Sequence, residues 1–155
     1  MKAYLFKVAL MHNKRVYRNI EILENQTLAI LHEIIFDAFD RYDEHLYSFF
    51  MTGKSTRSTR TIYDSPEYTH PMALQQQYGL GFKKQYNAAE STIGKLSLRE
   101  KEKLYYLFDF GDEWWHELTV LKIQNAAQSK QYPKIVKKAG ESPDQYPDYE
   151  EEDEF

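Results

Sequence analysis

Residues 104–123, LYYLFDFGDEWWHELTVLKI, carry a pattern that is typical of a β-hairpin. Two runs of aromatic and β-branched residues flank a central Gly-Asp pair, which is a strong turn signal between strands. A loop of three residues would pair Phe108 with His116 and gather the bulkiest side chains on one face. A loop of two residues would instead set Asp109 beside Trp114. The sequence leaves both registers open.

The amino-terminal part of the chain predicts a second hairpin and one amphipathic helix. Apolar residues alternate with period two over 4–10 and again over 16–22, on either side of a turn. Thr27 is placed to cap a helix over 28–41, because its hydroxyl can accept a hydrogen bond from a free backbone N–H of the first turn. The apolar stripe of this helix predicts that it lies across a sheet. The stripe consists of Leu28, Leu31, Ile35, Phe39 and Tyr42.

The middle of the chain gives weaker signals. We expect strands over 45–51 and 59–63. Residues 64–89 contain prolines, glycines and no sustained period, which predicts a long loop that ends in a short helix around 91–98. Together these elements predict a single α+β domain over residues 1–140, with a mainly antiparallel sheet of about five or six strands and one principal helix packed on a face.

Composition excludes several classes of protein. The 155 residues include no cysteine, which excludes disulfides and thiolate metal sites and is typical of the cytoplasm. No apolar run approaches the roughly 18 residues of a membrane span, and the first residues do not resemble a signal peptide. We therefore expect a soluble cytoplasmic protein that makes no contact with membranes.

The charge of the chain is divided unevenly. Residues 141–155 hold eight acidic side chains and no lysine or arginine. The rest of the chain keeps 16 of the 24 acidic side chains against all 20 basic ones, so its formal charge is about +4. Such a run of like charges is typical of a disordered tail.

Four short motifs follow one another in a fixed order. They are VYRNIEI at 16–22, Thr27-Leu28 with Leu31-His32, HLY at 45–47 with Phe49, and DFGD at 109–112 with Trp114 and His116. In this order they resemble the plasmid open-reading-frame-three-like family, some of whose members are described as passenger or resolvase-named proteins of an insertion element. The resemblance implies an α+β domain of a mobile-element-associated bacterial or archaeal family and implies no established activity. Tyr17 and Tyr42 stand where the family usually has tryptophan, which weakens any inference that a ligand site is kept.

Three histidines of these motifs are candidate metal ligands. His32, His45 and His116 could meet Asp109 and Asp112 in a metal or acid–base site, and zinc, manganese or iron would accept such ligands. The spacing matches no local metal motif, so the fold would have to assemble the site. In the structural alternative, the buried histidines are hydrogen-bonded within the core and the aspartates hold a tight turn. No cofactor is predicted, and a divalent metal is the alternative.

Basic residues near aromatic ones raise the possibility of nucleic acid, since rings stack on bases while Lys and Arg meet phosphates. A solvated loop is the competing interpretation of this pattern. The candidates are Lys54, Arg57, Arg60, Lys83 and Lys84.

The functional interpretation is a binding or interaction module for an unknown ligand, with Trp114 as a further candidate contact. It rests on the aromatic content, the resemblance and the lack of a local catalytic motif. A metal-dependent or acid–base enzyme and a nucleic-acid-binding accessory protein are the alternatives. The sequence does not indicate the oligomeric state.

Overall fold

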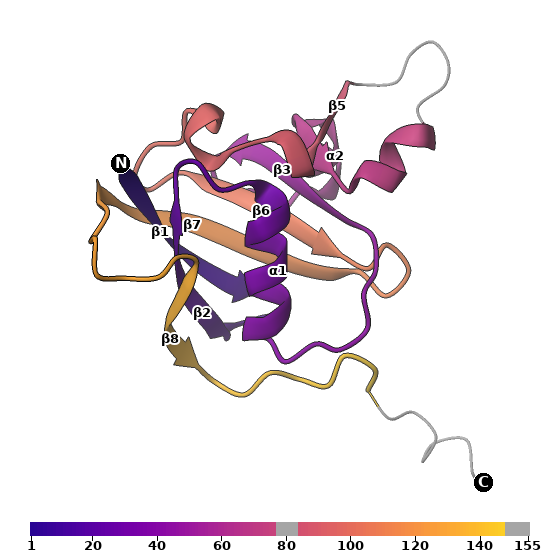
Figure 1. Cartoon of the computed structure of the whole chain (residues 1–155). Coiled ribbons are helices and arrows are strands. Elements are labelled where there is room, and N and C mark those ends of the chain that lie inside the picture. The colour runs from indigo at the N-terminus through magenta and orange to yellow at the C-terminus, as the bar shows by residue number, and fades with distance from the viewer. Residues whose placement is uncertain (77–83, 148–155) are drawn as a thin grey trace, which may run out of the picture.

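The computed structural model describes residues 1–76 and 84–147, whose strands form one eight-stranded sheet (Figure 1). The order across the sheet is β5-β4-β3-β6-β7-β1-β2-β8, and all neighbours are antiparallel except β4 and β5. The strands are β1 (Lys2–Leu10), β2 (Asn13–Leu23), β3 (Tyr47–Gly53), β4 (Glu67–Thr69), β5 (Gln85–Asn87), β6 (Lys103–Phe108), β7 (Trp114–Asn125) and β8 (Lys134–Ala139).

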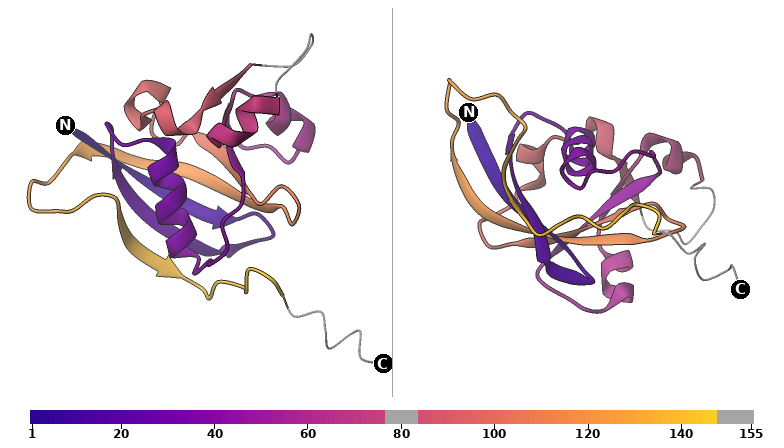
Figure 2. Two further views of the ribbon diagram at one scale, coloured as in Figure 1. Left: turned by 45° about the vertical axis from the view of Figure 1, so that its right-hand side comes forward. Right: turned by 90° about the horizontal axis from the view of Figure 1, so that it is seen from below.

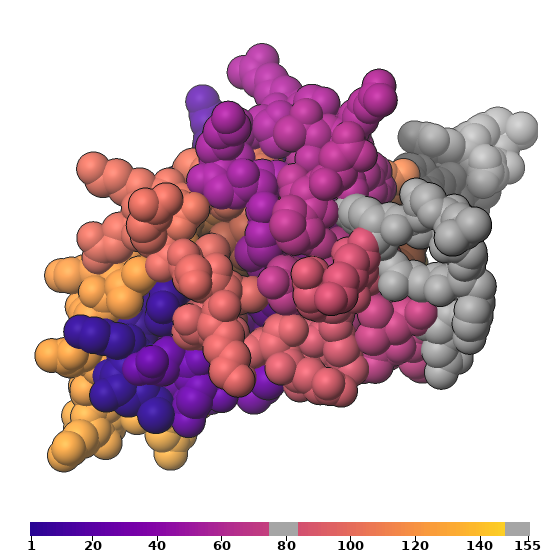
Figure 3. All heavy atoms as spheres, turned by 90° about the horizontal axis from the view of Figure 1, so that it is seen from above, coloured from indigo at the N-terminus to yellow at the C-terminus, as the bar shows by residue number. Residues whose placement is uncertain are grey.

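The sheet has more strands than the five or six that the sequence predicts. Both β4 and β5 lie within the segment expected to be a loop, and each is three residues long. A strand of that length shows no measurable alternation, so periodicity cannot detect it. In Figure 3 the chain before residue 77 and the chain after residue 83 lie side by side, as the pairing of β4 with β5 requires.

The strand predicted over 59–63 is wrong, because these residues form the helix α2 (Thr59–Asp64). The Ser58 hydroxyl accepts a hydrogen bond from the Thr61 N–H at 3.1 Å, which caps the first turn. Ile62 is buried against the sheet. Capping and this contact outweigh the β propensity of the run. The helix expected around 91–98 is a single 3-10 turn, Ile93–Leu96.

The carboxyl-terminal hairpin exists, but its register is neither of the two considered. Phe108 pairs with Trp114, and five residues, 109–113, connect the strands. Asp109 accounts for the longer connection. Its Oδ1 accepts the N–H groups of Gly111 and Asp112 at 3.0 and 3.2 Å, and its backbone has a φ of 66°. Asp tolerates this left-handed conformation better than most residues.

The helix α1 (Leu28–Ala38) crosses one face of the sheet, and α2 lies on the other (Figure 2). Thr27 caps α1 as expected, with its Oγ1 3.3 Å from the Ile30 nitrogen. The helix ends earlier than predicted, and Tyr42 is 69% exposed rather than part of the apolar stripe. The main core lies between α1 and the sheet, where Phe36 meets Phe108 at 5.7 Å between ring centroids.

The predicted acidic tail is partly described. Ser142 accepts a hydrogen bond from Arg18, and buried Gln145 bonds the backbone of residues 42 and 43. Residues 141–147 therefore lie against the domain, and 148–155 are outside the described residues. Within the described part of the chain, every helix is too short or too polar to cross a membrane.

Candidate functional site

A row of polar side chains lies buried between α1 and the sheet. His32 of α1 has its Nδ1 2.6 Å from the hydroxyl of Tyr106 on β6. His116 of β7 has its Nδ1 3.1 Å from the carbonyl oxygen of Tyr106. The Nη2 of Arg41, which follows α1, lies 2.8 Å from the Nε2 of His116. The fold thus brings predicted candidates His32 and His116 to one layer but gives each a different set of partners.

Burial keeps both imidazoles neutral. It lowers the pKa of His32 to about 3 and lowers the pKa of His116 well below its usual value, and the charge of Arg41 acts in the same direction on each. Because Arg41 donates to Nε2 of His116, the ring proton of His116 lies on Nδ1 and is donated to the carbonyl of Tyr106. Both nitrogens of His116 are therefore occupied within the core.

The other predicted pair meets at the end of the sheet. His45 has its Nε2 3.4 Å from Asp109 Oδ2 and 2.5 Å from the hydroxyl of Tyr146. The Tyr146 hydroxyl also lies 2.5 Å from Asp43 Oδ2. The hydrogen bond to Asp43, burial and the charges of Asp43, Asp109 and Asp112 raise the pKa of Tyr146 to about 12. That shift indicates a negative potential around Tyr146.

Two pockets adjoin these groups. The first, called here the Trp114 pocket, has a volume of about 580 Å³ and is lined by His12, Asp112, Glu113, Trp114, Gln145, Tyr146 and Pro147. The second, called the Glu44 pocket, has a volume of about 530 Å³ and is lined by Glu33, Glu44, His45, Leu46, His70 and Met72. His45 lines the Glu44 pocket and contacts Tyr146 of the Trp114 pocket, so it separates the two.

The Trp114 pocket has an aromatic wall. The rings of His12 and Trp114 lie 5.7 Å apart, and Trp114 rests on Arg41, whose guanidinium carbon is 5.4 Å from the indole ring. The Nε1 of Trp114 and the Nη1 of Arg41 are buried and have no hydrogen-bonding partner among the described residues. They lie beneath the surface, so Asp112 and Glu113 are the charged groups that face solvent here.

The predicted basic residues lie on separate elements. Lys54 and Arg57 are exposed in the segment before α2, and Arg60 is 3.9 Å from Asp64 within that helix. Lys84 has its Nζ 5.2 Å from the ring of Tyr86 at the β5 edge. Lys83 lies outside the described residues.

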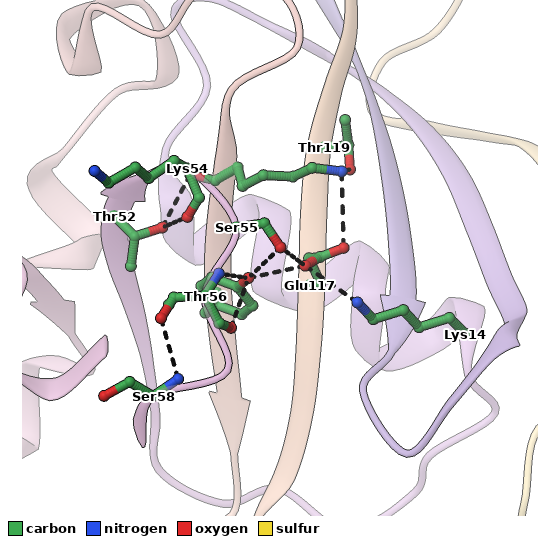
Figure 4. Close-up of polar contacts among 10 residues, drawn as sticks. Lys14, Thr52, Lys54, Ser55, Thr56, Ser58, Glu117 and Thr119 are labelled. Atoms are coloured by element: carbon green, nitrogen blue, oxygen red, sulfur yellow. Dashed lines mark hydrogen bonds and ion pairs between the residues drawn. The ribbon is translucent and has the colours of Figure 1, made fainter. Parts of the chain in front are cut away.

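Sequence reasoning missed a polar network on the face opposite α1 (Figure 4). Buried Glu117 of β7 lies 2.8 Å from the hydroxyl of Tyr105 and 3.1 Å from that of Ser55. Lys14 and Lys103 approach its carboxylate to 3.3 and 3.7 Å. Burial alone would raise the pKa of Glu117, but these hydrogen bonds and charges outweigh it and lower the pKa.

This network fastens residues 54–58 to the sheet. The Tyr105 hydroxyl accepts the N–H of Thr56 at 2.9 Å, and Ser55 reaches Glu117 directly. The alternation of β7 places Glu117 on the face opposite His116, which was readable from sequence. Its partners come from three other segments, and no local pattern connects them.

Comparison with known proteins agrees with the fold and the family. The model of the family described as plasmid pRiA4b ORF-3-like protein matches residues 2–148. A crystal structure of a protein of unknown function, MM3350 from Methanosarcina mazei Go1, superposes with a TM-score of 0.71 and 20% sequence identity, covering 93% of this chain and 73% of that one. At that identity the likeness shows the fold alone. No curated protein matches the chain. The chain belongs to the plasmid pRiA4b ORF-3-like family.

Proposed function

We propose that this protein is a binding module and that its Trp114 pocket takes a cationic group, such as the side chain of an arginine. The observation that carries the proposal is the lining of the pocket. Aromatic rings of His12, Trp114 and Tyr146 meet the carboxylates of Asp112 and Glu113, and no lysine or arginine is among the seven lining residues. Aromatic faces and carboxylates together favour cations.

The charge balance around the pocket supports this choice. Asp43 and Asp109 lie behind Tyr146, and Asp112 and Glu113 line the pocket itself. Arg41 opposes them from behind Trp114, but it is a single charge and is 92% buried. One oxygen of Glu113 accepts the indole N–H of Trp115 at 3.2 Å, which leaves its other oxygen for a ligand.

Calorimetric titration with arginine amide and with citrulline amide tests the proposal. The citrulline side chain has nearly the same shape as the arginine side chain but is uncharged, and both amides carry the same α-amino group. Only arginine amide should therefore bind with measurable heat. The double variant Asp112→Asn/Glu113→Gln should weaken binding by about tenfold or more, which corresponds to about 1.4 kcal/mol.

A matched control removes two carboxylates that are exposed and outside the pocket, with Glu90→Gln/Glu100→Gln. It should keep the affinity within about twofold, because neither carboxylate lines the pocket and salt screens exposed charges. Equal binding of both amides, or equal losses in the two double variants, would remove the proposal. Association with mobile elements and a cytoplasmic location stay predictions.

A further inference from the structure

His32 is a buried imidazole with one nitrogen at the edge of the core. The residue is 2% exposed, and its ring stacks on Tyr47 at 3.9 Å between centroids with 8° between the planes. Its Nδ1 is held by the Tyr106 hydroxyl at 2.6 Å. The Nε2 points to two carboxylates, with 3.1 Å to Glu44 Oε2 and 3.7 Å to Glu33 Oε1. Packing and one hydrogen bond thus fix where Nε2 points.

We infer that His32, Glu33 and Glu44 bind one divalent metal ion of the zinc or manganese class beside the Glu44 pocket, which Glu33 and Glu44 line. Their three ligand atoms all lie within 4.8 Å of one another. One imidazole and two carboxylates are donors that these ions accept, and a set of three protein ligands leaves a position open to solvent. The site is separate from the Trp114 pocket, so neither proposal depends on the other.

The second nitrogen of His32 has the partner that a ligand histidine requires. Metal-bound histidines generally donate their other ring N–H to a fixed oxygen, which sets the tautomer and the ring orientation. Without metal, the Nε2 proton is donated to Glu44 and the Tyr106 hydroxyl donates to Nδ1. With metal on Nε2, the ring proton lies on Nδ1 and is donated to the Tyr106 oxygen. His32 is neutral in both states, so only the tautomer changes.

The charges around Glu44 also favour a cation. Glu33 and Glu44 are exposed, and Asp37 lies one turn along α1 from Glu33. Burial and the charges of Glu33, Asp37 and Asp43 raise the pKa of Glu44. A divalent ion bound between the two glutamates would offset this mutual repulsion.

The other histidines near the site do not complete it. The Nδ1 of His70 accepts the N–H of Met72 at 3.0 Å, so the Nε2 of a neutral His70 carries the proton and cannot ligate. His45 is directed to Tyr146 and Asp109, and both nitrogens of His116 are engaged. The inferred ligand set therefore shares only His32 with the set considered from sequence.

Titration of the full chain, purified without a histidine tag and treated with chelator, tests the inference. Zn²⁺ and Mn²⁺ should each bind at one equivalent, whereas Ca²⁺, which prefers sites made of oxygen ligands, should not. Glu44→Gln and Glu33→Gln should each weaken Zn²⁺ binding by about tenfold or more, since each removes a charged ligand. Asp37→Asn is the matched control, because it removes a neighbouring charge but no ligand. Its effect should stay within about threefold.

The tautomer of His32 separates this site from adventitious surface binding. Long-range proton–nitrogen NMR should show His32 changing from the Nε2–H to the Nδ1–H form as one equivalent of Zn²⁺ is added. Three outcomes would overturn the inference: no Zn²⁺ binding, Zn²⁺ binding that leaves the His32 tautomer unchanged, or equal affinity in the Glu44→Gln and Asp37→Asn variants.

Discussion

Arg41 and His116 are joined in the core by a hydrogen bond of 2.8 Å from Nη2 to Nε2. Arg41 lies in the segment that follows α1 and His116 lies on β7, so the bond ties that segment to the sheet. Arg41 also lies over the rings of Phe39 and Phe108, each 5.1 Å from its guanidinium carbon. Burial lowers the pKa of Arg41 to about 10, which still leaves it charged at neutral pH.

Breaking this bond should cost stability. Arg41→Met fills much of the same space but leaves the buried Nε2 of His116 without a donor, and we expect a loss of about 1–3 kcal/mol in the free energy of unfolding. Arg41→Met/His116→Phe removes both partners and should be more stable than the sum of the single changes implies. Urea unfolding of the four proteins measures this coupling. Additive losses would show that the bond contributes nothing.

His116 should make the protein sensitive to acid. Its folded pKa is lowered by burial and by Arg41, so the unfolded state binds the proton first as pH falls. Its contribution to stability is present above the unfolded pKa of about 6.5 and declines below it, by up to about 1.4 kcal/mol per pH unit.

Unfolding midpoints in urea at pH 7.5, 6.5 and 5.5, with chelator present, measure this effect. His116→Gln should show a shallower decline than the native protein, because the titrating group is gone. The same slope in both proteins would assign the pH dependence to other residues.

Glu117 should hold the segment 54–58 in place. Glu117→Gln keeps the shape but weakens the contacts with Lys14, Lys103 and Ser55, and should cost about 1–2 kcal/mol. Because Lys54 and Arg57 are exposed trypsin sites in this segment, limited proteolysis should cut there faster. Tyr105→Phe removes the hydroxyl that accepts the Thr56 N–H and should act in the same direction. Unchanged cleavage in both variants would contradict this role.

Asp109 should be replaceable by asparagine but not by alanine. Asparagine keeps an oxygen for the N–H groups of Gly111 and Asp112 and tolerates the φ of 66°. Alanine has no side-chain oxygen to accept these hydrogen bonds and tolerates this φ less well. Asp109→Ala should therefore lower the free energy of unfolding by about 1–3 kcal/mol, and Asp109→Asn should lower it clearly less. Thermal unfolding of the two variants measures these losses. Equal losses would mean that the charge of the Asp109 carboxylate contributes more to stability than its hydrogen bonds within the turn.

Helices and strands whose apolar residues recur with a clear period could be predicted from the sequence. Elements that depend on tertiary contacts could not. The two hairpins and α1 follow from alternation and from the Thr27 cap. The three-residue strands β4 and β5 do not, because β4 depends on pairing with β3 and β5 depends on pairing with β4. The register of the carboxyl-terminal hairpin depends on the hydrogen bonds of the Asp109 side chain, which extend the connection beyond the Gly-Asp pair.

The candidate sites were likewise predictable only in part. The sequence nominated His32, His45 and His116, but their partners come from other elements. Glu44 reaches His32 only because the chain turns back after α1, and Arg41 reaches His116 for the same reason. Neither contact can be inferred from a local pattern in the sequence. The family could be inferred because its motifs are local, and the match over residues 2–148 confirms it.

The most direct measurement of the proposed function is the indole N–H signal of Trp114 in an NMR titration, assigned by comparison with a Trp114→Phe variant. Arginine amide should shift this signal in a saturable way, and Asp112→Asn/Glu113→Gln should reduce the shift at each concentration. Citrulline amide should leave the signal in place. Equal shifts with both amides, or a signal that arginine amide does not move, would contradict a cation-binding pocket at Trp114.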